Sequence, residues 1–149
     1  KGKGAWKQSA EGKITRLSVN NKNDIENLHF VVSPAYNKDR TKDKFVSSAF
    51  SKQTYSRIAS GGLKVGLIAG GVADAVYFPP DNTDKWDYCA SDIIIREAGG
   101  TITDTRGNPL NYSLPRNEFP DSFICSNGKI QQKLIEKYNQ FINSHSKTI

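Results

Sequence analysis

Along this chain of 149 residues, segments with the hydrophobic pattern of a strand alternate with segments that have the hydrophobic pattern of a helix. Polar and apolar residues largely alternate over 13–19, which predicts a half-buried strand because successive side chains of a strand point to opposite faces. The compact apolar run at 28–33 predicts a buried strand, and the Ser33-Pro34-Ala35-Tyr36 segment breaks it. Further strands are predicted at 55–59, 73–78, 101–103 and 122–125.

Between these strands, apolar residues recur three and four positions apart, the spacing that gives a helix one buried face. One helix is predicted to begin between Asn37 and Thr41, and the others follow Gly62, span 85–98 and span 129–143. The residues expected to face inward are Phe45, Val46, Ala49 and Phe50; Val65, Leu67, Ile68 and Ala69; Trp86, Cys89, Ala90, Ile93, Ile94 and Ala98; and Ile130, Leu134, Ile135, Tyr138 and Ile142. Strands and helices alternate about four times, which indicates one layered α/β domain with a central sheet.

The net charge of +6 favours an anionic partner, either nucleic acid or a phosphorylated small molecule. Basic residues are interleaved with acidic ones instead of gathering on one face with aromatic residues. We therefore interpret most of them as solvated surface and expect no nucleic-acid partner. Because no run of about 18 apolar residues is present, we also expect no membrane span.

The two cysteines, Cys89 and Cys125, fall on the predicted helix at 85–98 and in the last strand. We interpret both as buried reduced thiols, with a disulfide as the alternative, and reduced thiols favour a cytoplasmic location. The chain has no methionine and begins Lys1-Gly2-Lys3-Gly4, so we expect that processing or truncation removed its initiator.

The helix at 85–98 carries a carboxylate at its start. Asn82, Thr83 or Asp84 can cap it, and Gly99-Gly100 can close it. Asp87 then lies in the first turn beside Trp86, a ring that we expect to be packed. The position suits a metal ligand, but aspartate is also common there because it interacts favourably with the helix dipole. The residues alone leave both interpretations open.

A second candidate is Ser60-Gly61-Gly62-Leu63-Lys64, at a predicted strand-to-helix turn. Unpaired amides and missing side chains at such a turn let an anion approach closely, although glycine pairs are also common in ordinary turns. Lys64 lies near the positive end of its helix, where the dipole disfavours a cation. That unfavourable placement favours a lysine that binds an oxyanion.

Three stretches resemble the inositol monophosphatase-like, metal-dependent phosphatases. They are Trp86-Asp87 followed by Ala90, then Glu97-Ala98-Gly99-Gly100, then Thr103-Asp104-Thr105-Arg106-Gly107-Asn108-Pro109-Leu110. Within that family the sequence is most similar to 3'(2'),5'-bisphosphate nucleotidases of the bacterial sulfate-assimilation type, from Gly2 to about Ser126. The resemblance implies an α/β/α sandwich with a mixed central sheet, the second half of a sugar-phosphatase-like fold.

The resemblance also implies a magnesium-dependent phosphatase in which Asp87 is a Mg²⁺ ligand. It implies that Lys64, beside Ser60, Gly61 and Gly62, faces the substrate phosphate. Two places depart from the nucleotidases: Gly61 stands where a serine is frequent, and Ser33-Pro34-Ala35-Tyr36 replaces a Ser-x-Ser-His loop. Tyr36 can stack on a nucleobase or pack locally, so the substrate stays open.

The family's other metal ligands, a glutamate and an Asp-Pro-Ile/Leu-Asp-Gly-Thr motif, lie upstream of the region that this chain resembles. The chain contains no such motif, and Asp24-Ile25-Glu26 does not match it. We therefore expect a carboxyl-terminal half that is inactive alone, with no catalytic residue beyond Asp87. Residues 1–12 would be the remnant of a hairpin of the upstream half, and 144–149 a frayed tail.

The favoured function is removal of the 3'-phosphate of adenosine 3',5'-bisphosphate by a cytoplasmic enzyme that includes the upstream half. Hydrolysis of an inositol or sugar phosphate is the first alternative, and a non-catalytic binding module of the same fold is the second. A homodimer is compatible with each. His29 and His145 have no partners at metal-ligand spacing, and Asp81, Asp84 and Asp92 are interpreted as caps or surface charges.

Overall fold

A five-stranded sheet organises the computed structural model, which describes residues 1–34, 41–80, 84–113, 115 and 117–145, without the side chains of 41–43. The elements are β1 (Trp6–Gln8), β2 (Ile14–Arg16), β3 (Leu28–Val32), α1 (Thr41–Ala49), β4 (Gln53–Arg57), α2 (Gly61–Ala69), β5 (Ala75–Phe78), α3 (Lys85–Glu97), β6 (Thr101–Asp104), β7 (Phe123–Ser126) and α4 (Gln131–His145). The strand order is β4-β3-β5-β7-β6, while β1 and β2 form a separate hairpin.

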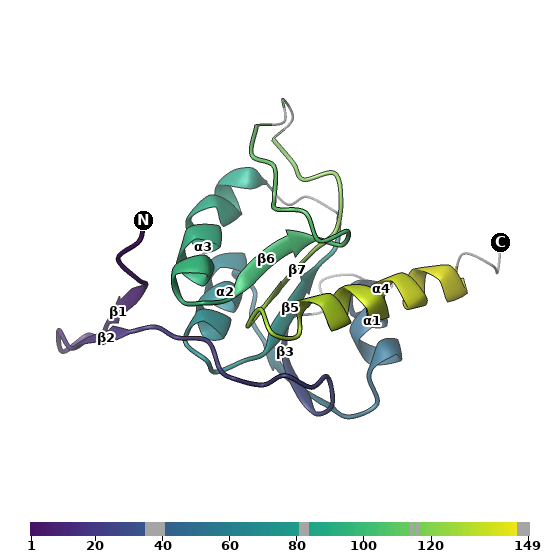
Figure 1. Ribbon diagram of the computed structural model, residues 1–149, viewed down its shortest axis with the longest axis horizontal. Coiled ribbons are helices and arrows are strands. Elements are labelled where there is room, and N and C mark those ends of the chain that lie inside the picture. The colour runs from purple at the N-terminus through teal and green to yellow at the C-terminus, as the bar shows by residue number, and fades with distance from the viewer. Residues whose placement is uncertain (35–40, 81–83, 114, 116, 146–149) are drawn as a thin grey trace.

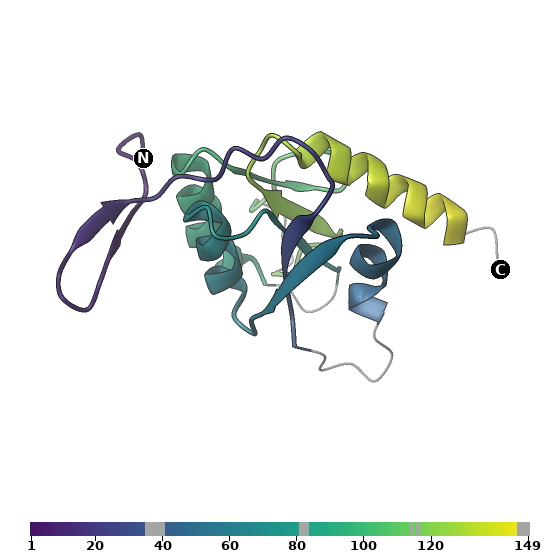
Figure 2. The same cartoon turned by 90° about the horizontal axis from the view of Figure 1, so that it is seen from below.

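The sheet is mixed and is covered on both faces (Figures 1 and 2). Strand β3 runs parallel to β4 and β5, whereas β7 runs antiparallel to β5 and β6. Helices α2 and α3 pack together on one face, and α1 and α4 cover the other. The predicted α/β/α sandwich with a mixed central sheet is thus confirmed.

Each sheet face has its own core, and the strands supply them alternately. On β7, Phe123 and Cys125 join the core beneath α2 and α3, whereas Ile124 joins the core beneath α1 and α4. The predicted inward residues Phe45, Val46 and Phe50 of the α1 region are buried in the second core. The apolar positions of α1 and β7 therefore fill the cores on the two faces, as expected for a central sheet that is covered on both sides.

The predicted buried face of α3 is wrong. Trp86 is 61% exposed, and Ile93, Ile94, Cys89 and Ala90 are also exposed. Of the predicted residues Ala98 alone is buried, and the others that face the sheet are Tyr88, Ser91, Asp92 and Ile95.

Asp92 explains why the hydrophobic pattern of α3 is misleading. The sequence predicts a cap or surface charge, but Asp92 is buried, since its carboxylate accepts hydrogen bonds from Arg96 Nε and, at 3.1 Å, from the Tyr112 hydroxyl. Burial, with a smaller contribution from the nearby Asp92 carboxylate, raises the pKa of Tyr112. A charged side chain can line a core when its partners satisfy it, and hydrophobic periodicity does not register such a residue.

The cysteines are both free, and they differ in environment. Cys125 is buried as predicted, and burial raises the pKa of its thiol, which makes it unreactive. Cys89 is exposed on the outer side of α3, so the expectation of two buried thiols is wrong.

Helix α4 continues to His145, past the predicted end at 143; residues 146–149 lie outside the described part of the chain.

The amino-terminal hairpin projects from the body of the domain (Figure 2). All residues of β1 and β2 are exposed, so the strand predicted at 13–19 is present only as β2 and is not half-buried there; Leu17 and Val19, beyond its end, are half-buried against the core beneath α2 and α3. The hairpin reaches Arg16, beyond the predicted boundary at residue 12. It is attached at its base, where the Glu97 carboxylate at the end of α3 accepts hydrogen bonds from the Gly2 amide at 2.5 Å and the Gly4 amide at 2.8 Å.

These two amide bonds lower the pKa of Glu97 below its ordinary 4.5. A carboxyl group whose pKa is lower in the folded state stabilises the fold above pH 4.5 and loses that contribution as the pH falls through its folded value. We therefore expect the hairpin base to loosen on acidification below pH 4.5. The indole N–H of Trp6, which donates to Lys3 O at 3.0 Å, is a local reporter for nuclear magnetic resonance.

In Glu97→Gln the same indole resonance should already be shifted at neutral pH and should lose its acid dependence. An identical acid titration in the wild type and in the variant would contradict the assignment of this anchor.

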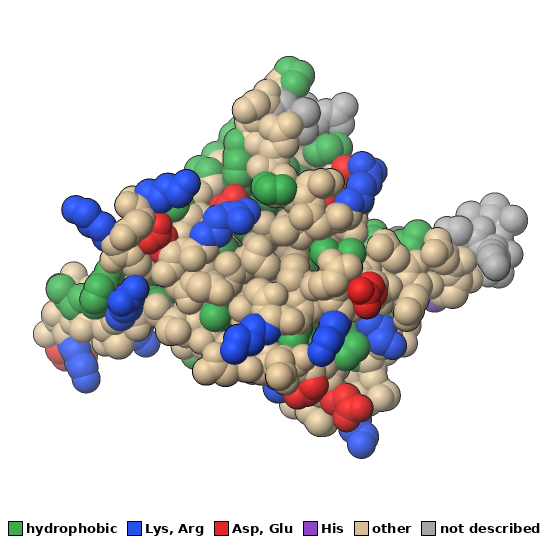
Figure 3. All heavy atoms as spheres, in the orientation of Figure 1, with side chains coloured by type: hydrophobic (Ala, Val, Ile, Leu, Met, Phe, Trp, Pro, Cys, Tyr) green, Lys and Arg blue, Asp and Glu red, His purple; other side chains and the backbone are tan. Residues whose placement is uncertain are grey.

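On the face of the molecule shown in Figure 3, basic side chains lie among acidic ones, in line with the sequence pattern. Lysine and arginine side chains stand apart on the visible face and do not merge into one stripe. Among the described helices, none has both the length and the apolar character needed to cross a membrane.

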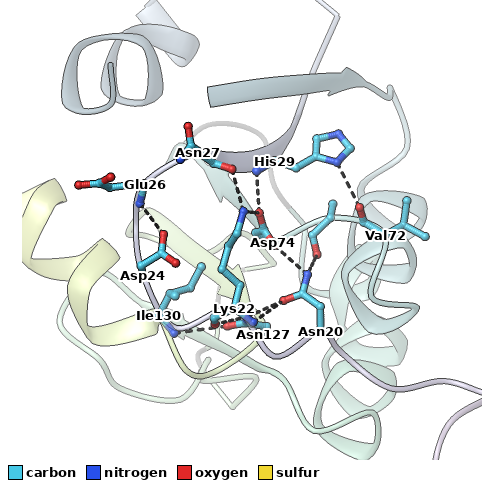
Figure 4. Close-up of polar contacts among 11 residues, drawn as sticks. Asn20, Lys22, Asp24, Glu26, Asn27, His29, Val72, Asp74, Asn127 and Ile130 are labelled. Atoms are coloured by element: carbon cyan, nitrogen blue, oxygen red, sulfur yellow. Dashed lines mark hydrogen bonds and ion pairs between the residues drawn. The ribbon is translucent and has the colours of Figure 1, made fainter. Parts of the chain in front are cut away.

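A network of polar side chains surrounds Asp74, directly before the amino end of β5 (Figure 4). Asp74 is 3% exposed, and its carboxylate accepts from Asn20 Nδ2 at 2.7 Å, Lys22 Nζ at 3.2 Å and the His29 amide at 2.6 Å. Asn127 Nδ2 in turn donates to Asn20 Oδ1 and to Lys22 O, both at 2.8 Å. The network fixes the 20–27 loop against the sheet, at the end opposite the candidate site.

Candidate functional site

The candidate residues lie where three parallel strands end. Strands β3, β4 and β5 point the same way, so the turns after Val32, Arg57 and Phe78 lie along one edge of the sheet. Helices α2 and α3 begin just after β4 and β5 and bring their amino termini to this edge. Ligands of α/β sheets bind at such carboxyl edges because loops and helix amino termini converge there.

Helix α2 starts at the predicted glycine turn. Ser60 is its N-cap, with the hydroxyl accepting from the Leu63 amide at 3.3 Å. Gly61 packs against α3, since a Cβ there would lie 2.4 Å from the Tyr88 hydroxyl and 2.8 Å from Tyr88 Cζ. The first glycine thus lets the two helix starts approach, and Gly62, where a Cβ would lie 3.4 Å from Ser91 Oγ, lies next to it on the same contact.

Asp87 is in the first turn of α3, as predicted, and is exposed. Its amide donates to Asp84 O at 3.1 Å, whereas Asp84, the N-cap, makes no capping bond with its side chain. Burial, with a smaller contribution from the adjacent Asp87 carboxylate, raises the pKa of the Tyr88 phenol, so Tyr88 stays neutral. Asp87 is therefore a solvent-accessible carboxylate. The side chain of the next residue, Tyr88, packs between the start of α3 and the start of α2.

Lys64 is 3% exposed, which is unusual for a lysine. Its Nζ donates to Ser33 Oγ at 2.6 Å, directly after β3, and lies 5.4 Å from the centre of the Phe78 ring at the end of β5. The buried ammonium therefore links the ends of two strands at the carboxyl edge. It also brings a positive charge to the edge at which Asp87 contributes a negative one.

Gly61→Ala should lower the free energy of unfolding by about 1–3 kcal/mol, because the new methyl group overlaps the Tyr88 hydroxyl. Gly66→Ala is the matched control, because Gly66 lies in the same helix and a Cβ there would have no described neighbouring atom within 4 Å. This substitution should raise the free energy of unfolding by roughly 0.5–1 kcal/mol. Urea denaturation measures both. Adding Tyr88→Phe to Gly61→Ala should restore part of the loss, and failure to do so would refute the steric explanation.

The structure thus brings Ser60, Gly61, Gly62 and Asp87 to neighbouring helix starts and places Lys64 on the same sheet edge. Tyr36 lies outside the described residues. Among the described residues, no three histidine, cysteine, aspartate or glutamate side chains are grouped so as to hold a metal ion. The described residues therefore do not form a complete metal site, and Asp87 is a single exposed carboxylate among them.

Sequence reasoning missed two members of the site, Tyr88 and the pairing of Ser33 with Lys64. The spacing of Tyr88 from Ser91, Asp92 and Ile95 is helical, but two of those residues are polar. In the sequence, Ser33 belongs only to a loop that follows a strand. No local signal connects it with Lys64, because the contact spans 31 positions.

Comparison with known proteins agrees with this fold. A model of the inositol monophosphatase family matches residues 1–143. The chain is 36% identical over 66 residues to mouse 3'(2'),5'-bisphosphate nucleotidase 1, and 30% identical over 100 residues to a fructose-1,6-bisphosphatase/inositol-1-monophosphatase of Thermotoga maritima. An inositol monophosphatase structure from Thermotoga maritima superposes with a TM-score of 0.67 at 23% identity, over 91% of this chain.

The chain belongs to the inositol monophosphatase family and has its phosphatase fold. Members of this family generally use divalent metal ions. The matches cover 44% of this chain and 21% of the mouse protein, and 66% of this chain and 36% of the Thermotoga protein. The chain spans about half, 51%, of the solved Thermotoga structure.

Proposed function

We propose that this chain is the phosphate-binding part of a magnesium-dependent phosphomonoesterase that removes the 3'-phosphate of adenosine 3',5'-bisphosphate. The observation that carries the proposal is Asp87, an exposed carboxylate at a helix start that packs, through Tyr88, against the glycine start of α2. The membership of the chain in a phosphatase family supports the reaction class. The similarity of the chain to bisphosphate nucleotidases supports the substrate.

Each residue has a definite role in this proposal. Asp87 is one ligand of a magnesium ion. The backbone amides of Gly61 and Gly62, at the positive end of α2, donate hydrogen bonds to the phosphate oxygens. Lys64 supplies positive charge at the same edge, held there by Ser33. When bound, magnesium neutralises charge on a phosphate ester and lowers the pKa of a bound water. Tyr36 is proposed to stack on the base.

The remaining metal ligands are proposed to come from a complementary half, meaning the portion of the family fold outside this match. The described residues hold no grouped set of ligands, and the chain spans only 51% of the solved Thermotoga protein. We therefore expect the isolated chain to show no magnesium-dependent turnover. Measurable turnover by the purified chain would show that the complementary half is dispensable.

The direct test is a substrate panel for the chain mixed with the complementary half of the Thermotoga enzyme, with and without magnesium. Adenosine 3',5'-bisphosphate should be hydrolysed faster than inositol 1-phosphate and fructose 1,6-bisphosphate. The reverse order would favour the inositol or sugar phosphate alternative, which the fructose-1,6-bisphosphatase/inositol-1-monophosphatase relative supports. Nucleotide binding by calorimetry without turnover of any substrate would favour a non-catalytic binding module.

A further inference from the structure

A pocket of about 290 Å³ lies where strands β3 and β4 begin, at the opposite edge of the sheet from the candidate site. Three segments that are far apart in the sequence line it: the 20–27 loop, the turn between α1 and β4, and α4. Its volume is close to the lower limit for pockets that hold small molecules, about 300 Å³. The pocket therefore has room for one small molecule, and none of its lining residues has a role in the proposed reaction.

One part of the pocket wall is apolar. Ile25 and Ala49 are half-buried there, and Phe50 is buried. The second core holds Phe50 in place, since its ring centre lies 5.0 Å from that of Phe30 and 5.8 Å from that of Phe45. Packed aromatic rings of this kind offer a fixed surface to an apolar group of a ligand.

Two lysines bring positive charge to the pocket, Lys52 directly before β4 and Lys137 on α4. The two preceding lysines on the same side of α4, Lys129 and Lys133, donate hydrogen bonds to the 20–27 loop. Lys137, one turn further along, is half-buried. Among the described residues, neither its ammonium group nor that of Lys52 has a hydrogen-bond or ion-pair partner. An anionic group in the pocket would supply that partner.

The same pocket also carries negative charge. Glu26 lines it, and Figure 4 shows the Glu26 carboxylate pointing away from the network around Asp74. Helix α1 ends at Ala49, so its last carbonyl groups, which carry the negative end of the helix dipole, lie at the pocket. Within the described part of the chain, the Glu26 carboxylate forms no ion pair with either lysine. The two signs of charge are therefore presented separately in one pocket.

We propose that this pocket binds a small zwitterion, an α-amino acid with an apolar side chain. The carboxylate of the amino acid pairs with Lys52 and Lys137, its ammonium group pairs with Glu26 and the carboxyl end of α1, and its side chain packs on Phe50. A simple anion would face Glu26 and the helix carbonyl groups without compensation, and a simple amine would face both lysines. A ligand that carries both charges matches both. This site is separate from the phosphatase site and does not depend on the proposed function.

The test is calorimetric titration of the purified chain with three probes that share one apolar skeleton. They are L-leucine, isocaproate, which lacks the ammonium group, and isoamylamine, which lacks the carboxylate. L-leucine should bind at least about tenfold more tightly than either of the others, because each of them loses one hydrogen bond between charged groups. In nuclear magnetic resonance spectra, the amides of Ser51 and Lys52 should shift when L-leucine is added.

Absence of L-leucine binding at millimolar concentration, or equal binding of the three probes, would overturn the proposal. The titration contains neither magnesium nor the complementary half. Its result is therefore separate from that of the phosphatase test, and either proposal can fail alone.

Two substitutions distinguish the two charged contacts. Lys137→Gln should weaken binding of L-leucine and isocaproate roughly tenfold and leave that of isoamylamine unchanged, because it removes a partner of the carboxylate. Glu26→Gln should weaken binding of L-leucine and isoamylamine by about the same factor and leave that of isocaproate unchanged. Lys44→Gln is the matched control, since Lys44 is exposed on α1 but does not line the pocket.

The control should bind L-leucine like the wild type, and all three variants should unfold at the wild-type urea concentration, as surface substitutions usually do. L-leucine binding that neither pocket substitution changes would place the amino acid elsewhere and overturn the proposal. Sensitivity to Lys137→Gln without sensitivity to Glu26→Gln would overturn it too, because the pocket would then be a site for simple anions.

Discussion

Replacing Asp87 with asparagine should lower the magnesium-dependent phosphatase rate of the complex between this chain and the complementary half by at least about a hundredfold. Loss of a residue that merely orients a metal ligand costs about 10–100-fold, and loss of the ligand itself should cost more. Asparagine keeps the shape of the side chain but removes its charge. Because Asp87 is exposed, the change should leave the fold intact.

The rate should be measured over a range of magnesium concentrations, since loss of a ligand should also raise the concentration that gives half-maximal activity. Glu136→Gln is the control: Glu136 is an exposed carboxylate on α4 that accepts a hydrogen bond from Gln132, and it lies on the opposite sheet face. An Asp87→Asn complex with wild-type rate and wild-type magnesium dependence would refute the assignment and leave Asp87 as a helix-dipole residue.

Replacing Asp74 with alanine should lower the free energy of unfolding by about 1.5–3 kcal/mol, the usual contribution of hydrogen bonds to a charged group. The carboxylate is 3% exposed and accepts from Lys22, Asn20 and the His29 amide (Figure 4). Its removal takes the acceptor from the His29 amide, while Lys22 Nζ keeps Asn27 O at 2.7 Å and Asn20 Nδ2 keeps Ala73 O at 3.4 Å.

Asp24→Ala is the matched control, because Asp24 belongs to the same loop but is exposed and accepts from the Glu26 amide. It should cost no more than about 1 kcal/mol in the same urea titration. Equal losses for the two variants would show that the network around Asp74 adds nothing to stability beyond an ordinary surface contact.

The layered fold was predictable because its strands and most of its helices bury residues in regular patterns. The buried residues of β3, and Phe45, Val46 and Phe50 in and just after α1, are all apolar, so the hydrophobic pattern identified these elements. The face of α3 was not predictable, since Asp92 is buried with its partners while Trp86 and Ile94 are exposed. The exposure of β2 was equally hidden, because a sequence shows that a strand has an apolar side but not what covers it.

The candidate site was predictable where local backbone chemistry decides it. Glycine at a helix start and aspartate in a first turn are local signals, and both identified elements that meet at the carboxyl edge. The burial of Lys64 and its bond to Ser33 depend on β3 and β4 lying side by side, which no local pattern specifies. That distant contact decides whether the lysine is a surface charge or a buried cation.

The contacts of Asn127 set an order for folding during synthesis. Its side chain bonds to Asn20 and Lys22, across 107 and 105 positions, and its strand neighbour β7 pairs with both β5 and β6. The bonds of the early loop to Asn127 can form only after residue 127 has been made, later than the bonds of Asn20 and Lys22 to Asp74. Such distant closures slow folding and prolong the exposure of unpaired strand edges.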